Sequence, residues 1–234
     1  MIVRDGWSFI FVALALSIAV LFGALRWDSL VLMIVASCLA VLTVIMAFFF
    51  RDPDRIIPDD HLAMLAPADG LVVAIEPIDH PHIDGPATRI SIFLSVFDVH
   101  INRVPCGGTI DYVQYNPGKF MAAFADKASD LNERTEIGLT TPQGHKLVFT
   151  QIAGLIARRI VCRLSEGDSV AAGERFGMIR FGSRSDLIVP ATWNLAVKMG
   201  DRVKGGTTVI GYLPDHVGNQ PQPDNVTESD VEEL

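Results

Sequence analysis

Cysteine, basic charge and cofactor-binding motifs are all scarce in this chain of 234 residues. The three cysteines, Cys38, Cys106 and Cys162, form no C-x-x-C pair, which argues against a disulfide framework or a zinc site and favours a reducing compartment. The 19 Lys and Arg against 27 Asp and Glu argue against a basic nucleic-acid-binding protein. No phosphate-binding loop, nucleotide fingerprint or metal-ligand spacing is present. We therefore expect no metal ion and no nucleic-acid partner.

Apolar and acidic residues are distributed unevenly along the chain. Hydrophobic residues make up 50% of it, and two runs, 7–25 and 29–50, contain no charge. The segment 214–234 contains no Lys or Arg, and we predict that it is a disordered acidic tail. Residues 51–213 have the composition of an ordinary globular domain. The acids of the tail are Asp215, Asp224, Glu228, Asp230, Glu232 and Glu233.

The two apolar runs predict a membrane anchor at residues 1–50. Each run is long enough to cross a hydrocarbon core of about 30 Å as a helix, and the short connector 26–28 predicts a hairpin with both ends on one side. A buried helix pair in a soluble core and a cleaved signal peptide are the alternatives, which two long successive runs disfavour. Arg4, Arg51 and Arg55 on one side against Arg26 on the other favour a cell-membrane protein with its domain facing the cytoplasm.

Residues 51–213 have the pattern of a predominantly β domain. Short runs rich in Val, Ile, Phe or Tyr alternate with Gly, Pro and Asp, and the best helical candidate is the short segment 119–126. We therefore expect a sandwich or barrel-sandwich-like domain with few short helices, preceded by the helical hairpin. The predicted strands are 71–75, 88–96, 109–115, 146–152, 160–164 and 207–213.

An internal repeat supports this fold class. The pattern G-D-x-V-x-x-G occurs at 167–173 and again at 200–206, which indicates two similar β-turn-β units with glycines at turn positions. Such units also build biotinyl and lipoyl carrier domains, which present a lysine at an exposed hairpin tip. Lys198 and Lys127 are the candidates for such a lysine, and neither fits that position well.

The segment 177–190 contains a Gly182-Ser183 step between two β-type runs. Glycine tolerates strained backbone and leaves its carbonyl open to the next hydroxyl. The serine oxygen can then attack that carbonyl, and elimination of the resulting ester leaves dehydroalanine, which hydrolyses to an N-terminal pyruvoyl group. In isolation, however, a Gly-Ser step is most often a plain turn.

Four phrases in this order give the step its context: APADG at 66–70, FLSVFDVHINRVP at 93–105, QIAGLIARRI at 151–160 and FGS at 181–183. Together they closely resemble the phosphatidylserine decarboxylase family, in its short, single-domain proenzyme branch, over about residues 45–213. The resemblance implies a self-cleaving enzyme that converts phosphatidylserine in the membrane to phosphatidylethanolamine and carbon dioxide. Cleavage between Gly182 and Ser183 would give a β chain, 1–182, and an α chain, 183–234, that remain together as a heterodimer.

The cofactor that the resemblance implies is the pyruvoyl group made from Ser183. Its carbonyl forms a Schiff base with the substrate amine and acts as an electron sink when the carboxylate leaves. His100 is the candidate for proton transfer, because it is the histidine that lies within a family-like phrase. Asp69, in a Pro-x-Asp-Gly turn, is the candidate that orients an imidazole. Ordinary structural roles are the alternatives for both residues.

The chain departs from the longer branch of the family at two positions. Arg103 stands where that branch has a second histidine, and arginine is a poor general base. Either His100 serves both cleavage and decarboxylation, or another group assists cleavage. Arg103 is a candidate for contacting the substrate phosphate or carboxylate, with a strand salt bridge as the alternative. Arg184 stands where the longer branch has a threonine after the Gly-Ser step, so any role of the threonine hydroxyl would fall to Ser185.

Three further questions stay open at this level. The segment 119–124 carries apolar side chains beside a cation and could dip into the headgroup layer, although an ordinary core helix fits it better. A membrane-tethered carrier module and a decarboxylase of another serine-headgroup lipid, such as archaetidylserine, are the competing functions. The oligomeric state beyond the heterodimer is undetermined.

Overall fold

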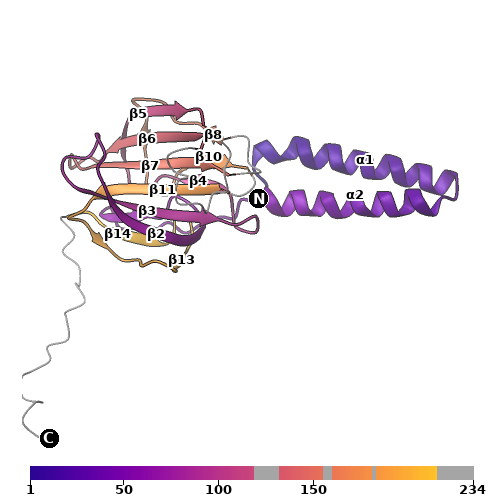
Figure 1. The fold of residues 1–234 in the computed structure, drawn as a ribbon. Helices are drawn as coiled ribbons and strands as arrows, with labels where there is room; N and C mark the ends of the chain where they lie inside the picture. Colours follow the sequence, from indigo (N-terminus) through magenta and orange to yellow (C-terminus); the bar gives the residue numbers. More distant parts are fainter. Residues whose placement is uncertain (119–131, 155–159, 181–182, 215–234) are drawn as a thin grey trace, which may run out of the picture.

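The protein consists of a helical hairpin that projects from a β-rich body (Figure 1). The computed structural model describes residues 1–118, 132–154, 160–180 and 183–214. A 3-10 turn, η1 (Arg4–Gly6), leads into α1 (Trp7–Arg26), and α2 (Leu30–Phe49) returns along it. The turn between them contains Asp28 in the left-handed region, at φ 46°. The predicted hairpin is confirmed.

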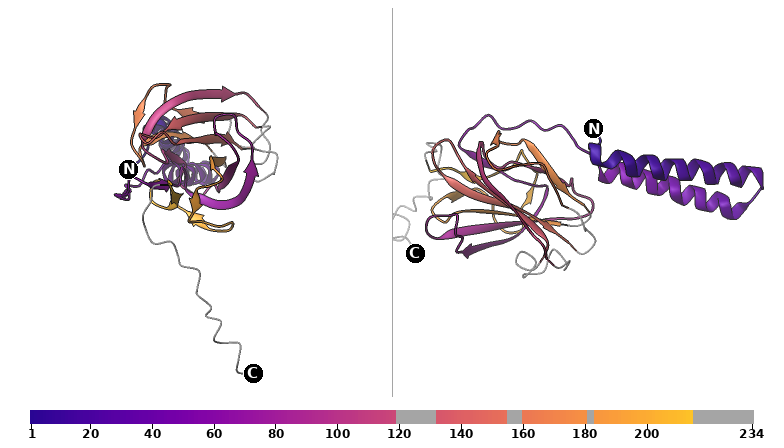
Figure 2. Two further views of the ribbon diagram at one scale, coloured as in Figure 1. Left: turned by 90° about the vertical axis from the view of Figure 1, so that its left-hand side faces the viewer. Right: turned by 90° about the horizontal axis from the view of Figure 1, so that it is seen from above.

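Both hairpin helices are long and apolar enough to cross a membrane. Only 6% of the apolar part of α2 and 28% of that of α1 lie buried, and the pair extends away from the body (Figure 1; Figure 2, right). The helices of a soluble core would be mostly covered by protein. The alternative of a buried helix pair is therefore wrong.

The body is built on one eight-stranded antiparallel sheet that curls around two three-stranded sheets (Figure 2). The large sheet has the order β13 (Arg202–Val203), β2 (Gly70–Ile78), β3 (Ala87–Leu94), β11 (Ser183–Pro190), β7 (Lys146–Ala153), β6 (Arg134–Thr140), β5 (Gly108–Asn116), β9 (Ser169–Val170). One small sheet has the order β1 (Ala63–Leu65), β14 (Val209–Tyr212), β12 (Asn194–Leu195). The other has the order β4 (Ile101–Arg103), β10 (Arg175–Ile179), β8 (Ile160–Cys162).

The strand order has an internal two-fold symmetry. About the centre of the large sheet, β13 corresponds to β9, β2 to β5, β3 to β6 and β11 to β7, and the two small sheets correspond in the same way. The predicted repeat forms equivalent turns, since Asp168 accepts a bond from Ser165 N and Asp201 accepts one from Lys198 N. All four of the repeat's glycines have φ between 74° and 91°, as a left-handed turn requires.

The core lies between the inner face of the large sheet and the small sheets. Alternate residues of the strands point inward, so that Ile90, Ile92, Phe149 and Leu187 are fully buried in one cluster. The intervening residues line the outer face, which carries charged side chains.

All six predicted strands are present, as β2, β3, β5, β7, β8 and β14. The strand β6 was not predicted, because Arg134, Glu136 and Gly138 interrupt its apolar pattern. The predicted helix 119–126, the membrane-dipping segment 119–124 and nearly all of the tail lie outside the described residues.

The linker after α2 fixes the hairpin to the body. Val3 N donates to Phe50 O, and Met1 and Asp52 exchange backbone hydrogen bonds of 2.7 and 3.0 Å. The Asp52 carboxylate, with an 11% exposed side chain, lies 2.8 Å from Arg175 Nε and 3.6 Å from Arg103 Nη2. Backbone pairing therefore joins the two ends of the hairpin to each other, and the ion pairs of partly buried Asp52 join them to the body.

We expect Asp52→Asn to lower the stability of the body by about 1–3 kcal/mol, because hydrogen bonds to charged groups are worth that much when poorly hydrated. Asp54→Asn is the matched control, since the Asp54 side chain is 80% exposed and 3.4 Å from the same arginine. Such a surface pair contributes little. Thermal unfolding in detergent micelles measures both variants, and equal shifts would contradict the role of Asp52.

Candidate active site

Ser183 begins β11, at the centre of the large sheet. It pairs with Leu94 of β3 on one side and Ala153 of β7 on the other. Its side chain is completely buried, and among the described residues its Oγ has no hydrogen-bond partner. A buried hydroxyl without a partner is unfavourable and is uncommon outside functional sites. Gly182 lies outside the described residues.

His100 lies just before β4, at the same end of the body. Its backbone carbonyl accepts a hydrogen bond from Ile179 N, four residues before Ser183. The ring is 1% exposed, and Nδ1 lies 2.9 Å from the carbonyl oxygen of Asp98. Because a carbonyl only accepts, Nδ1 carries the proton of the neutral ring, which leaves the lone pair on Nε2. Among the described residues, Nε2 has no partner.

Burial lowers the pKa of His100 to about 4, against the raising effect of Asp98. The charged ring would lose most of its hydration at this position, so the neutral form is favoured. Above pH 4 the ring is therefore neutral and able to accept a proton at Nε2. This is the protonation state that a general base needs at neutral pH.

The end of α2 covers His100. The Phe49 ring lies 4.4 Å from the imidazole centroid, and Phe49 and Phe50 pack with Val99, Ile101 and Met178 in one buried cluster. The hairpin thus meets the body at the end of the large sheet where Ser183, Leu94 and Ala153 lie. The sequence did not predict this contact, because the helix and the histidine are 51 positions apart.

Two buried amides, Asn102 and Gln151, extend this polar region. Gln151 Nε2 donates to Asn102 Oδ1 at 2.9 Å and to Val161 O at 3.1 Å. Both residues are completely buried, yet Asn102 Nδ2 and Gln151 Oε1 lack partners among the described residues. Ser183 is in β11, Asn102 in β4 and Gln151 in β7, and His100 directly precedes β4. A large polar residue within the mostly apolar run 147–153 was the available signal for Gln151.

Asp69 has other partners than the predicted imidazole. Its carboxylate accepts two hydrogen bonds from Arg55 Nη2, at 2.7 and 3.0 Å, and one from Gly205 N at 2.8 Å. His100 is held instead by the backbone carbonyl of Asp98. In this structure Asp69 therefore does not orient His100, and it joins the linker to the second repeat turn. A catalytic role for Asp69 remains a prediction.

Arg103 is engaged with the linker. Its Nη1 donates to Gly173 O at 2.9 Å, and Nη2 donates to Pro53 O at 3.4 Å beside Asp52. Burial lowers its pKa from the ordinary arginine value. These contacts match the salt-bridge alternative, and substrate binding by Arg103 remains a prediction.

The side chains of Arg184 and Ser185, which follow Ser183, already have partners within the sheet. Arg184 is paired with Asp186 at 2.7 Å, and both side chains are buried on the outer face of the sheet. The Ser185 hydroxyl donates to Thr150 O at 2.8 Å. It is therefore not free to replace the missing threonine hydroxyl in this structure.

The carrier alternative gains no support from Lys198. This residue is exposed, but its backbone N–H donates to Asp201 within the repeat turn, as Ser165 does in the other turn. It is one half of a repeated structural turn rather than a distinct hairpin tip. Lys127 lies outside the described residues.

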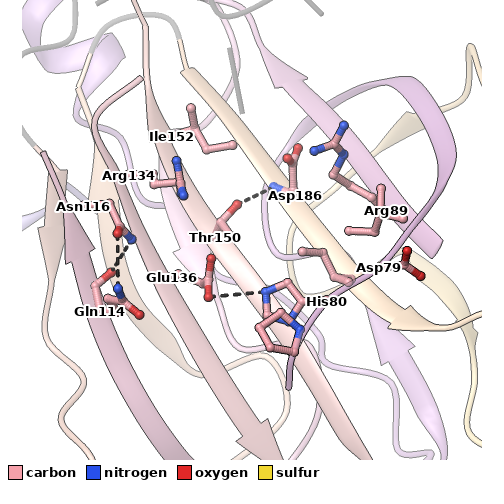
Figure 3. A pocket seen from close by; sticks show the side chains of 13 residues that line it. Asp79, His80, Arg89, Gln114, Asn116, Arg134, Glu136, Thr150, Ile152 and Asp186 are labelled. Atoms are coloured by element: carbon pink, nitrogen blue, oxygen red, sulfur yellow. Dashed lines mark hydrogen bonds and ion pairs between the residues drawn. The ribbon is translucent and has the colours of Figure 1, made fainter. Parts of the chain in front are cut away.

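A cavity of about 480 Å³ lies on the outer face of the large sheet (Figure 3), and neither Ser183 nor His100 lines it. The Glu136 carboxylate in this cavity already has partners: its Oε1 lies 3.3 Å from His80 Nε2 and accepts a hydrogen bond from the Tyr112 hydroxyl. Hydrogen bonding from His80 accordingly lowers the pKa of Glu136. Among the described residues no group of three or more His, Cys, Asp or Glu could hold a metal ion.

The sequence of the chain is similar to those of known proteins. The chain matches the family model of phosphatidylserine decarboxylase over residues 42–211. A phosphatidylserine decarboxylase proenzyme of Salinibacter ruber is 54% identical over 170 residues, which cover 71% of this chain and 75% of the relative. Proenzymes of the same name from Symbiobacterium thermophilum and Magnetococcus marinus are each 44% identical over 214 residues, covering 91% of this chain and 96% and 95% of theirs.

The family model and the named relatives define a class of phospholipid decarboxylases. The chain belongs to the phosphatidylserine decarboxylase family. The resemblance seen in the four sequence phrases is confirmed at the level of the family.

We expect Phe49→Ala to raise the pKa of His100 from about 4 towards the ordinary histidine value, because water would reach the ring. The chemical shift of the His100 ring, followed against pH by NMR in detergent micelles, measures this change. Phe48→Ala is the control, since Phe48 is 48% exposed and contacts Arg51 instead. An unchanged titration midpoint in the Phe49 variant would show that Phe49 does not keep water from the ring.

Proposed function

We propose that this protein is a membrane-anchored, self-processing phosphatidylserine decarboxylase whose pyruvoyl group derives from Ser183. The observation that carries the proposal is the buried Ser183 hydroxyl, which has no hydrogen-bond partner in the described part of the chain and lies at the end of the sheet that meets the hairpin. The word proenzyme in the names of the relatives supports processing of the chain. Neutral His100, at the same end, supplies a proton acceptor.

Self-cleavage begins when Ser183 Oγ attacks the carbonyl carbon of Gly182. The peptide C–N bond breaks and an ester forms. Loss of the Ser183 α proton then breaks the Cβ–O bond, and Gly182 leaves with a carboxylate. The dehydroalanine left at position 183 takes up water and releases ammonia to become the pyruvoyl group. We assign proton transfer in this sequence to Nε2 of His100, because its lone pair is free above pH 4.

The partnerless serine hydroxyl and the neighbouring buried amides fit a small carbonyl group at position 183. When present, this group condenses with the substrate amine and accepts the electrons released with carbon dioxide. His100 then transfers the proton that replaces the carboxylate. Asn102 Nδ2 is a free donor for a polar group bound there. The apolar cluster around Phe49 excludes water.

The α and β chains stay together because β11 is a central strand. It is paired over its length with β3 and with β7, both of which belong to the β chain. Further pairs, β13 with β2 and β14 with β1, also join the two pieces. Cutting before Ser183 therefore leaves a non-covalent heterodimer.

The hairpin places this chemistry at a bilayer surface. Both open ends of the hairpin lie at the body (Figure 1), and Phe49 at the end of α2 contacts His100, so the site lies close to the level at which the hairpin leaves the bilayer. Arg51 follows the end of α2, where its positive charge would lie beside the lipid phosphates of one leaflet. We propose a cell-membrane location with the body in the cytoplasm, on the basis of the arginines beside the hairpin ends.

Denaturing mass spectrometry of the purified protein tests the processing. We expect two pieces, 1–182 and 183–234, with residue 183 blocked by a pyruvoyl group, and their co-elution under native conditions. Ser183→Ala should remain a single inactive chain, because it has no nucleophile for the first step. An active, uncut wild-type chain would refute the proposal, and a modified Lys198 on such a chain would favour the carrier alternative.

We expect His100→Asn to lose decarboxylation by about 10²–10⁴-fold, the usual contribution of a positioned acid–base group. His61→Asn is the control, because His61 is exposed. Release of carbon dioxide from phosphatidylserine in mixed micelles, normalised to the amount of cut chain, measures the effect. Normal turnover per cut chain in the His100 variant would remove this residue from the mechanism.

A further inference from the structure

The turn between β3 and β4 exposes apolar side chains beside the hairpin base. Phe97 is 73% exposed and Val96 is 42% exposed. The turn is nevertheless well fixed, since Asp98 Oδ2 accepts hydrogen bonds from Ser95 N at 2.8 Å and from Ser95 Oγ at 2.7 Å. Presenting an aromatic ring to water on an ordered turn is unfavourable, and such rings commonly mark an interaction surface.

The turn is tied to the point where α2 ends. Arg51 Nη2 donates to the carbonyl oxygen of Phe97 at 2.6 Å, and Nη1 donates to Phe48 O at 2.8 Å. The same guanidinium lies 3.8 Å from the centroid of the Phe48 ring. Phe97 therefore lies at the level of the helix end, where a membrane-spanning helix leaves the hydrocarbon. Exposed Trp7 and Phe9 mark the same level on α1.

Basic groups border the turn. Arg202, whose side chain is 71% exposed, lies 3.3 Å from Asp98 Oδ1 and follows the turn that carries Lys198 and exposed Met199. Arg51 and Arg202 thus both contact the turn that carries the apolar pair. An aromatic ring with a cationic rim is the composition that binds phospholipid headgroups and the acyl boundary beneath them.

We infer that the 95–98 turn is a second membrane contact, which inserts Phe97 and Val96 into the leaflet that holds the hairpin ends. The occupant is phospholipid, because the turn continues the surface at which the hairpin would leave the bilayer. Val99 and His100 follow the turn directly, so its insertion sets the depth of the imidazole relative to the headgroups. The inference rests on the membrane position proposed for the hairpin.

Photo-cross-linking tests the contact without requiring catalysis. The full chain, with p-benzoylphenylalanine in place of Phe97, is reconstituted into vesicles of phosphatidylcholine and phosphatidylglycerol and irradiated. We expect phospholipid attached at position 97 and none at Gln143, an exposed residue in the turn between β6 and β7. That turn lies at the opposite end of the sheet, since β7 runs from there to Ala153 beside Ser183.

A third position separates the two possible failures. The same probe in place of Val41, an exposed residue of α2, reports whether the hairpin enters the bilayer. Lipid at position 41 with none at 97, or with peptide cross-links at 97, overturns the inference and leaves the proposed anchor intact. No lipid at either position overturns the membrane anchor itself.

A charge at position 97 gives an independent readout. We expect Phe97→Asp to raise KM for phosphatidylserine in vesicles, with kcat and the extent of chain cleavage unchanged. Gln143→Asp should leave all three unchanged. Equal KM values in the two variants would contradict membrane insertion of the turn.

Discussion

The packing of Phe49 and Phe50 against the segment around His100 is the contact on which the arrangement of this protein depends. Phe49 ends the second membrane-length helix and packs against the imidazole, and Phe50 follows it in the same buried cluster. Asp52 follows within three residues and ties the linker to Arg175. The orientation of the body towards the hairpin is therefore set by direct packing and ion pairing rather than by a flexible tether.

The same burial governs the chemistry of the site. It removes water from His100, so the ring is neutral, and the carbonyl of Asp98 selects the tautomer with a free Nε2. It also leaves buried polar atoms on Ser183, Asn102 and Gln151 without partners among the described residues. Each such atom costs folding free energy, and the large core and the long strand pairings of β11 offset this cost.

The local patterns of the sequence predicted most of the fold. Uncharged runs predicted the hairpin, and short runs rich in Val, Ile, Phe or Tyr between Gly, Pro and Asp predicted six strands, because these signals depend only on neighbouring residues. The repeat predicted two equivalent turns, and the structure extends it to a two-fold order of the whole body. Strand β6 was missed because Arg134 and Glu136, which lie on the polar outer face, interrupt the apolar composition by which the other strands were predicted.

The sequence by itself determined the hairpin, the β character of the body, the repeated turns and the Gly182-Ser183 step, since each is written in contiguous residues. Only the tertiary structure decided which side chains, distant in the sequence, contact one another. Asp69 pairs with Arg55 instead of the expected imidazole, Arg103 pairs with the linker, and Phe49 covers His100. Partners of this kind are separated by 14 to 51 positions, and their choice depends on which elements the sheet order brings together.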